Sequence, residues 1–330
     1  MLKIVQTDRP PRDRIEEDKI FSASGLDIDF KVHDCMDEDK LIEICQDADA
    51  IIVAYAPITK KVIDNMPRCR SISFMATGYN SVDLACATQK GIVVTNVPDY
   101  CSSDVADHTM ALLIDIGRSI IQLDKKVREG IWEYEACGQP NRLSEQTLGI
   151  IGLGRIGSKV AKRAQAFDLK VYAYDPYVNE EYMNSLGVKK TDLHEVLACD
   201  FVSLHCYLSE ETRNMINSQT LSEMKQTGYL INTARGACVD IEALTKTLKE
   251  GKIAGAALDV VFPEPLPVDH DIFKLENVIF TPHSAFLSTM ALREVRIKCA
   301  EEVVRALKGT IPNNVVNKEV LEQSNCRLNL

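Results

Sequence analysis

Three glycines at fixed spacing constrain the fold of this chain more than any other feature. They are Gly152, Gly154 and Gly157, which follow the apolar run Leu148–Ile151 and precede a helical pattern over residues 158–167. In a strand–turn–helix unit, the first glycine allows a tight turn, the second lets backbone approach a ligand, and the third lets helix and strand pack closely. The helix N-terminus then presents N–H groups to phosphates. The segment therefore predicts a site for the pyrophosphate of a dinucleotide.

An acidic residue follows at the spacing that such a site requires. Lys170–Tyr174 is the next expected strand, and Asp175 lies directly after it, 18 residues beyond Gly157. A carboxylate about 20 residues past the last glycine accepts hydrogen bonds from a ribose 2′-hydroxyl. It also repels a 2′-phosphate, and no arginine or lysine follows it at once. The sequence therefore favours NAD over NADP.

Short apolar runs alternate with helical stretches along the chain, which predicts parallel sheets with helices on both faces. The strands expected in the first hundred residues are Leu2–Val5, Ala50–Ala54, Ser71–Met75 and Gly91–Thr95. The strands expected in the second series are Leu148–Gly152, Lys170–Tyr174, Phe201–His205, Gly228–Asn232, Ile253–Asp259 and Asn277–Thr281. Six strands with intervening helices make one complete doubly wound fold. The sequence therefore predicts an α/β protein with two doubly wound parallel-sheet domains.

Two long helices decide where the domains divide. A length of 330 residues suggests two domains. Ser102–Ser119 reads as one amphipathic helix, and Thr289–Leu307 follows the last expected strand. Because this final helix could return to the first unit, we expect a discontinuous first domain of residues 1–101 and 289–330. Residues 102–288 form the expected dinucleotide-binding domain.

Composition excludes several classes of protein. The formal net charge of −10 argues against nucleic-acid and membrane-surface partners, which need basic patches. Eleven cysteines without a C-x-x-C pair indicate free thiols in the cytoplasm, and no metal site is expected. The chain begins with a strand-like run, so no signal peptide is expected, and no apolar run reaches the ~18 residues that span a bilayer.

Three polar residues follow late strands of the second series, at the edge where parallel sheets bind ligands. They are Arg235, Glu264 and His283. A histidine backed by a carboxylate exchanges a proton near neutral pH. An arginine clamps a carboxylate with two hydrogen bonds and polarises a carbonyl. Beside a dinucleotide site, the set predicts acid–base chemistry on a substrate that carries a carboxylate.

The chain resembles the D-isomer-specific 2-hydroxyacid dehydrogenases over nearly its whole length, and six stretches carry the resemblance. The stretches are Ala76–Asp83, Gly152–Gly157, Asn232–Gly236, Ala257–Val260, Glu264-Pro265 and Thr281–His283. The resemblance implies NAD-dependent reduction of a 2-keto acid to a D-2-hydroxy acid, and the reverse. His283, paired with Glu264, would exchange the proton of the substrate oxygen, and Arg235 would hold the substrate carboxylate.

The resemblance also implies which residues meet the ligands. The implied cofactor contacts are Gly152, Gly154, Arg155, Ile156, Gly157, Asp175, Cys206, Tyr207, Thr212, Thr233, Ala234, Arg235 and Asp259, the last at the nicotinamide. The implied substrate contacts are Tyr55, Thr77, Gly78, Arg235 and His283. The backbone N–H groups of Thr77 and Gly78 would bind the far side of the substrate carboxylate.

The resemblance further implies a flavodoxin-like substrate domain built from both chain ends and a Rossmann NAD-binding domain, joined by two helices. Catalysis would lie in the cleft, where closure excludes water. Members commonly form homodimers through the NAD-binding domain. Residues 130–132, with the loop to Leu148, are the candidate dimer arm, although Trp132 is equally plausible as a core anchor.

The substrate stays open between small acids such as glyoxylate, hydroxypyruvate and pyruvate, and larger 2-keto acids. Relatives that act on phosphorylated acids tend to carry an arginine near the segment at Tyr55. None stands there along the sequence, which argues against 3-phosphoglycerate, although Lys60 or Lys61 could contact a phosphate. Residues 97–109 resemble the branch near the C-terminal-binding-protein corepressors, so an NAD-binding regulatory dimer with little turnover is the alternative function.

Several polar residues near the expected site have plainer explanations. We expect His108 to pack between domains, with a place at the cleft as the alternative, and His205 to be structural because it ends a central strand. Cys101 and Cys238 are assigned to packing, since hydride transfer needs no nucleophile.

Overall fold

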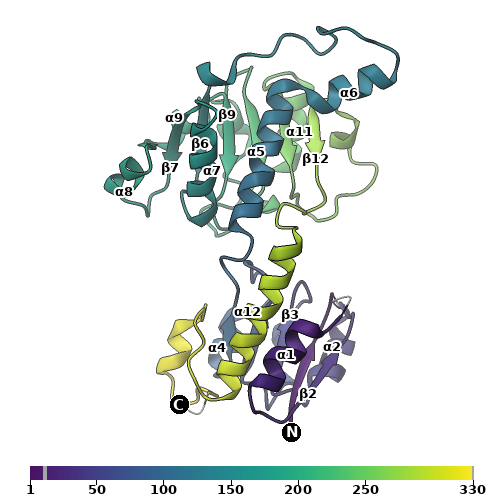
Figure 1. The fold of residues 1–330 in the computed structure, drawn as a ribbon, viewed down its shortest axis with the longest axis vertical. Coiled ribbons are helices and arrows are strands. Elements are labelled where there is room, and N and C mark those ends of the chain that lie inside the picture. Colours follow the sequence, from purple (N-terminus) through teal and green to yellow (C-terminus); the bar gives the residue numbers. More distant parts are fainter. Residues whose placement is uncertain (10–12, 329–330) are drawn as a thin grey trace. The chain divides into compact units, whose positions relative to one another are not determined.

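The chain divides into two compact units, each with its own sheet. The structure is a computed structural model that describes residues 1–9 and 13–328. Residues 10–12 and 329–330, which the predicted first domain includes, lie outside the described residues. The first unit comprises Met1–Cys101 and Ser288–Leu330, and the second comprises Ser102–Leu287. Both are α/β units (Figure 1).

The first unit is a five-stranded parallel sheet in the order β2-β1-β3-β4-β5. Its strands are β1 (Leu2–Gln6), β2 (Ile28–Val32), β3 (Ala50–Val53), β4 (Ser71–Phe74) and β5 (Val93–Thr95). The order 2-1-3-4-5 is that of flavodoxin-like folds, in which ligands bind beyond the carboxyl ends of the strands. The predicted flavodoxin-like fold is confirmed.

Helices from both ends of the chain complete the first unit. They are α1 (Ile15–Ala23), α2 (Glu38–Cys45), α3 (Lys60–Asp64), α4 (Leu84–Gln89) and α12 (Thr289–Leu307), with the 3₁₀ helix η4 (Lys318–Glu322). Helix α12 packs against α1 and the sheet (Figure 1). Its Val295, Cys299 and Val303 share a buried cluster with Ile4 and Ile52. The last long helix therefore completes the core of the N-terminal sheet.

The second unit is a seven-stranded parallel sheet in the order β12-β11-β10-β9-β6-β7-β8. Its strands are β6 (Thr147–Ile151), β7 (Lys170–Tyr174), β8 (Lys189–Lys190), β9 (Phe201–Leu204), β10 (Tyr229–Asn232), β11 (Gly255–Leu258) and β12 (Val278–Phe280). Strands β7 and β8 are added on one side of β6, and β9 to β12 are added on the other. The boundary between β6 and β9 is the switch point at which doubly wound folds bind dinucleotides. The predicted Rossmann fold is confirmed.

Helices cover both faces of this second sheet. They are α5 (Ser102–Arg118), α6 (Ile120–Arg128), α7 (Arg155–Gln165), α8 (Glu180–Ser185), α9 (Leu193–Leu197), α10 (Ser218–Leu221) and α11 (Ile241–Lys249). The short 3₁₀ helices are η1 (Leu143–Glu145), η2 (Gly236–Cys238) and η3 (Asp271–Lys274). Helix α5 packs against α7 and over β10 and β11 (Figure 1). Helices α9, α10 and α11 contribute to the buried cluster of the other face.

Two of the observed strands are absent from the predicted set. The edge strand β2 alternates Ile28, Phe30 and Val32 with polar residues, and the buried side chain is that of Phe30. The other edge strand, β8, consists of two lysines. Short edge strands need little apolar surface, so β8 has no hydrophobic pattern from which to predict it.

All eleven cysteines lie in the described part of the chain and are free thiols. None of the helices formed by the described residues is long and apolar enough to cross a bilayer.

Candidate active site

Two of the three glycines after β6 are required by close backbone contacts. A Cβ on Gly152, whose φ is +92°, would lie 2.7 Å from the backbone nitrogen of Cys206. A Cβ on Gly157 would lie 2.2 Å from the carbonyl oxygen of Gly152. Any side chain at either position would push the turn away from β9 or α7 away from the turn.

Gly154 differs from the other two because the space around it is open. A Cβ there would meet no atom within 4 Å. Gly154 is also the N-cap of α7, and no side chain caps this helix. The first N–H groups of a helix have no partner within the helix. The open space beside Gly154, at the uncapped start of α7, leaves room for a ligand phosphate.

Asp175 orients the glycine turn from the end of β7. Its Oδ2 accepts a hydrogen bond of 2.9 Å from the Leu153 N–H, and its Oδ1 accepts one of 2.9 Å from the Tyr177 N–H. A carboxylate has about four acceptor sites, so two backbone donors leave capacity for a ribose hydroxyl. Asp175 therefore lies beside the glycine turn, in contact with Leu153.

The loop after β9 presents three predicted cofactor residues at the same edge. The Thr212 hydroxyl donates to the Tyr207 carbonyl over 2.6 Å and accepts from the Ser209 N–H over 2.8 Å, which closes the loop. A hydrogen bond with Cys238, together with burial, raises the pKa of the Cys206 thiol above its ordinary range. Cys206 is therefore a neutral thiol beside the glycine turn.

Buried Asn232 shapes the turn that carries Arg235. Its Oδ1 accepts from the Ala234 N–H over 3.0 Å, and its Nδ2 donates to the Arg235 carbonyl over 2.9 Å. A Cβ on Gly236 would lie 1.9 Å from the Val261 carbonyl oxygen. Glycine at 236 therefore allows this turn to pack against the loop that leads to Glu264.

His283 and Glu264, which the sequence predicts to act together, lie in direct contact. His283 Nδ1 lies 2.6 Å from Glu264 Oε1, and the two side chains are 30% and 39% exposed. His283 has a φ of +51°, which is uncommon for a residue with a side chain and must be held by its surroundings. Its ring also lies edge-on to Phe286, with 6.2 Å between the ring centroids.

Asp259 holds the turn that carries His283. Its carboxylate accepts hydrogen bonds from the Thr281 hydroxyl at 2.6 Å, the Ser284 N–H at 2.8 Å and the Ala285 N–H at 3.0 Å. Its backbone carbonyl accepts the His283 N–H at 2.8 Å. The Asp259 side chain is only 1% exposed. These contacts anchor the turn, and the contact with nicotinamide that the resemblance implies for Asp259 stays a prediction.

The first unit presents the predicted substrate residues at the carboxyl edge of its own sheet. Buried Asp8 accepts the Ala54 N–H at 3.0 Å and the Tyr55 N–H at 2.7 Å. Asn96 Nδ2 donates to the Thr77 carbonyl over 2.7 Å. Gly78 lies in the turn after β4.

Sequence reasoning missed an arginine in this first unit. Arg9 follows β1, and its guanidinium carbon lies 5.1 Å from the centre of the Tyr55 ring. The prediction against 3-phosphoglycerate rests on residues near Tyr55 along the sequence, whereas Arg9 is brought beside Tyr55 only by the fold. The signal was available, because β1 and β3 are neighbouring parallel strands whose carboxyl ends meet. Lys60 and Lys61, the alternatives considered, pair instead with Asp64 and Asp39.

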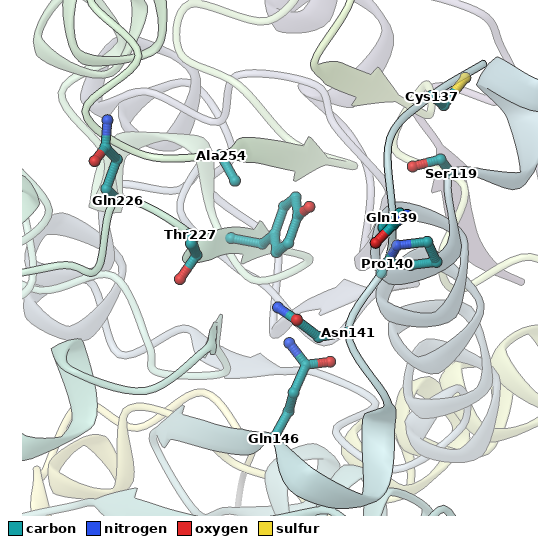
Figure 2. A pocket seen from close by; sticks show the side chains of 11 residues that line it. Ser119, Cys137, Gln139, Pro140, Asn141, Gln146, Gln226, Thr227 and Ala254 are labelled. Atoms are coloured by element: carbon teal, nitrogen blue, oxygen red, sulfur yellow. The ribbon is translucent and has the colours of Figure 1, made fainter. Parts of the chain in front are cut away.

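A separate cavity lies at the opposite, amino-terminal edge of the second sheet. Its volume is about 230 Å³, and Figure 2 shows Gln146 and Asn141 beside it. The described residues that line it include no acidic or basic side chain. A cavity without positive charge does not suit an anionic acid, and none of the predicted site residues lines it.

Known proteins are similar to this chain in sequence. A sequence model described as the NAD-binding domain of D-isomer-specific 2-hydroxyacid dehydrogenases matches residues 110–285. A glyoxylate reductase of Korarchaeum cryptofilum is 40% identical over 294 residues, which cover 86% of each chain. A D-3-phosphoglycerate dehydrogenase of Methanocaldococcus jannaschii is 36% identical over 326 residues, covering 98% of this chain and 61% of that protein.

A solved structure is similar to this chain in both fold and sequence. The D-lactate dehydrogenase of Aquifex aeolicus, complexed with NAD and lactic acid, superposes with a TM-score of 0.86 at 32% identity, covering 95% of this chain and 99% of that chain. The predictions of the family, of an enzyme and of NAD as cofactor are confirmed. Since the matched domain spans more than half of the chain, the protein belongs to the D-isomer-specific 2-hydroxyacid dehydrogenases and is an NAD-dependent oxidoreductase.

Proposed function

We propose that this enzyme reduces a small 2-keto acid to the D-2-hydroxy acid, and catalyses the reverse, with His283, Glu264 and Arg235 as its catalytic residues. The observation that carries the proposal is the 2.6 Å contact between His283 Nδ1 and Glu264 Oε1. Arg235 follows β10 and His283 follows β12 at the edge where doubly wound sheets bind ligands.

His283 handles the proton of the reaction. Since Nδ1 faces the Glu264 carboxylate, Nε2 is the ring nitrogen that gives a proton to the carbonyl oxygen during reduction and takes it back during oxidation. The carboxylate stabilises the imidazolium and fixes the orientation of the ring. NADH, when bound, supplies the hydride.

Arg235 binds the substrate carboxylate and polarises the carbonyl. One guanidinium nitrogen, Nη1, donates to the Ala234 carbonyl over 2.6 Å, which restrains the side chain. A guanidinium carries five N–H donors in a planar fork, so others can engage a carboxylate with two hydrogen bonds. We further propose that the backbone N–H groups of Thr77 and Gly78 bind the substrate carboxylate and that Tyr55 bounds the substrate side chain.

The residues around the glycine turn fit NAD. The open space at Gly154 and the uncapped start of α7 would hold the pyrophosphate, and Asp175 would hold the adenosine ribose. The remaining proposed contacts are Gly152, Arg155, Ile156, Gly157, Cys206, Tyr207, Thr212, Thr233, Ala234, Arg235 and Asp259, the last at the nicotinamide. We expect kcat/KM with NADH to exceed that with NADPH. Equal values would contradict the role of Asp175.

A panel of 2-keto acids tests the proposal. Glyoxylate, hydroxypyruvate, pyruvate and phosphohydroxypyruvate are mixed with enzyme and NADH, the loss of NADH absorbance is followed, and the product is resolved by chirality. We expect turnover of a small acid to the D product. Tight binding of NADH with no turnover of any acid would instead support a regulatory dimer. Because Arg9 lies over Tyr55, a preference for the phosphorylated acid, reduced by Arg9→Gln, would identify a phosphate subsite.

We also propose that the protein is a cytoplasmic homodimer associated through its NAD-binding unit. Helix α6 has no buried residue, and Trp132 and Tyr134 in the following loop are 86% and 89% exposed. Clustered exposed apolar side chains mark interaction surfaces. Light scattering should give the mass of a dimer, and Trp132→Ser with Tyr134→Ser should give that of a monomer. Tyr182→Ser, at an exposed tyrosine of α8, is the control.

A further inference from the structure

The two turns that carry Arg235 and His283 are tied to the same turn of helix α5. His108 Nε2 lies 3.0 Å from the Thr281 hydroxyl, and the Thr109 hydroxyl lies 2.9 Å from that of Thr233. Thr233 stands two residues before Arg235, and Thr281 stands two residues before His283. Adjacent residues of one helix therefore contact both turns.

The direction of the hydrogen bond at His108 follows from the number of protons available. A threonine hydroxyl has one hydrogen, and that of Thr281 is donated to Asp259 Oδ1 over 2.6 Å. Toward His108 the same oxygen can only accept, so His108 Nε2 carries a proton and donates it. His108 thus donates to Thr281, and Thr281 donates to Asp259, so the two hydrogen bonds run in one direction. Hydrogen bonds in such a chain polarise and strengthen one another.

This chain ends on the carboxylate that anchors the catalytic turn. Asp259 also accepts the N–H groups of Ser284 and Ala285, on the far side of His283. His108 Nε2 lies 3.7 Å from Asp259 Oδ1, so it faces the acid as well as the hydroxyl. A donor at this point fixes the Thr281 hydroxyl, and through it the carboxylate on which the turn depends.

The same counting applies to Thr109. Its hydroxyl lies 2.7 Å from the Val105 carbonyl, which can only accept, so its single hydrogen is donated there. Thr109 therefore accepts the hydrogen of the Thr233 hydroxyl. Thr109 and Thr233 are both buried, where an unmade hydrogen bond costs free energy. The turn before Arg235, like the turn before His283, is thus held to α5 by a side-chain hydrogen bond.

We propose that His108 and Thr109 are positioning residues that set the separation of Arg235 and His283 by bracing both turns against one helix. The proposal rests on the catalytic roles proposed above for those two residues. Neither His108 nor Thr109 touches the substrate in this scheme. Helix α5 packs over β10 and β11, so the two residues project from a helix that is held against the sheet. Hydride and proton transfer need this fixed geometry, because a displacement of ~1 Å at the reacting groups can cost about 100-fold in rate.

Two variants at each position separate the effect of the side chain's hydrogen bond from the effect of its volume. His108→Leu removes the Nε2 donor while keeping a similar volume, and His108→Gln places an amide N–H near the same point. Thr109→Val removes the hydroxyl, and Thr109→Ser retains it. We expect kcat for the best 2-keto acid of the panel to fall about 10-fold or more in His108→Leu and Thr109→Val. The KM for that acid and the melting temperature should change little, and the Gln and Ser variants should recover most of kcat.

Two results would overturn the proposal. One is a wild-type kcat in both His108→Leu and Thr109→Val. The other is a loss of kcat that follows the melting temperature and is not recovered by Gln or Ser, since that pattern describes packing alone. If His108→Leu does not fold, Thr281→Val and Thr281→Ser in its place test the same chain with the same two criteria.

A readout without turnover separates this proposal from the proposed function. Nitrogen-15 NMR of the histidine rings in the wild-type protein should show a protonated Nε2 on His108, and Thr281→Val should change its shift. An unprotonated Nε2 would overturn the brace even if the enzyme is active. If no 2-keto acid is reduced but the NMR result holds, the proposed function fails and the brace remains as a structural feature only.

Discussion

Two strands of the second sheet lead into histidines, and the two surroundings differ. His205 follows β9, at the centre of the sheet, and its Nε2 lies 2.9 Å from the buried Ser203 hydroxyl. Burial lowers the pKa of His205 to about 3. His283 follows β12, at the edge of the sheet, and pairs with the partly exposed Glu264 carboxylate.

The difference shows what a strand-end histidine needs for acid–base work. A histidine beside a hydroxyl, without a carboxylate partner, stays neutral at physiological pH and acts as a packing group. A histidine beside a partly exposed carboxylate has a charged partner that can orient its ring for proton transfer. The edge position of β12 leaves room for the loop that carries Glu264, whereas β9 is flanked by strands on both sides.

The largest expected effect is that of His283→Ala. We expect kcat to fall about 100- to 10,000-fold, the range of general acid–base catalysis, because the variant lacks the ring that is proposed to supply the proton. NADH binding, measured by fluorescence titration, should change little. His205→Asn is the matched variant and should retain most of its turnover. Near-normal activity of His283→Ala, or equal losses in both variants, would end the distinction between the two histidines.

The next effect concerns the carboxylate partner. Glu264→Gln keeps the shape of the side chain but removes the charge that balances an imidazolium, a loss of about 1.5–3 kcal/mol, or roughly 10- to 100-fold in kcat. Glu242 forms a similar contact of 3.1 Å with His270 Nε2 elsewhere in the unit. Glu242→Gln should therefore leave steady-state kcat unchanged, and an unchanged kcat in Glu264→Gln would show that His283 needs no charged partner.

His205 should make the protein less stable in acid. Its folded pKa, about 3, lies below the unfolded value of about 6.5, so the unfolded state binds the extra proton between these limits. The free energy of unfolding should then decrease as pH falls below about 6.5, by at most ~1.4 kcal/mol per pH unit from this group. Urea unfolding at pH 7 and pH 5 measures the decrease, and His205→Asn should lessen it. An identical decrease in the variant would exclude His205 as its source.

The smallest effect is expected at Ser203. Ser203→Ala removes the hydrogen bond to His205 Nε2 and should lower the free energy of unfolding by about 1 kcal/mol. Urea unfolding at pH 7 checks this value, with kcat as the control that should not change. A large loss of kcat would place His205 in the catalytic machinery.

Sequence patterns predicted long elements better than short ones. Thr289–Leu307 was expected as a helix and is α12, and Lys170–Tyr174 was expected as a strand and is β7. Long apolar periodicity reports burial directly. The two-lysine strand β8 has no such pattern, because an edge strand depends on a neighbour for pairing. Strand β2 alternates apolar and polar residues, but it buries only one side chain.

The site also contains residues that the sequence predicts and residues that it does not. The glycines, Asp175, Arg235, Glu264 and His283 were predictable because each stands at a fixed spacing or after an apolar strand. Arg9 was missed because its neighbour Tyr55 lies more than forty residues away along the chain. The bracing contacts of His108 and Thr109 were missed for the same reason.

The sequence by itself determined the class of fold, the glycine turn and the chemical groups available for catalysis, because local spacing and strand periodicity encode them. Only the tertiary structure decided which histidine pairs with Glu264, that Asp259 holds the turn before His283, and that one turn of α5 contacts the turns that carry Arg235 and His283. Those outcomes depend on which strands become neighbours and on whether a carboxylate stays in solvent or becomes buried. Both are properties of the packed sheet rather than of any local segment.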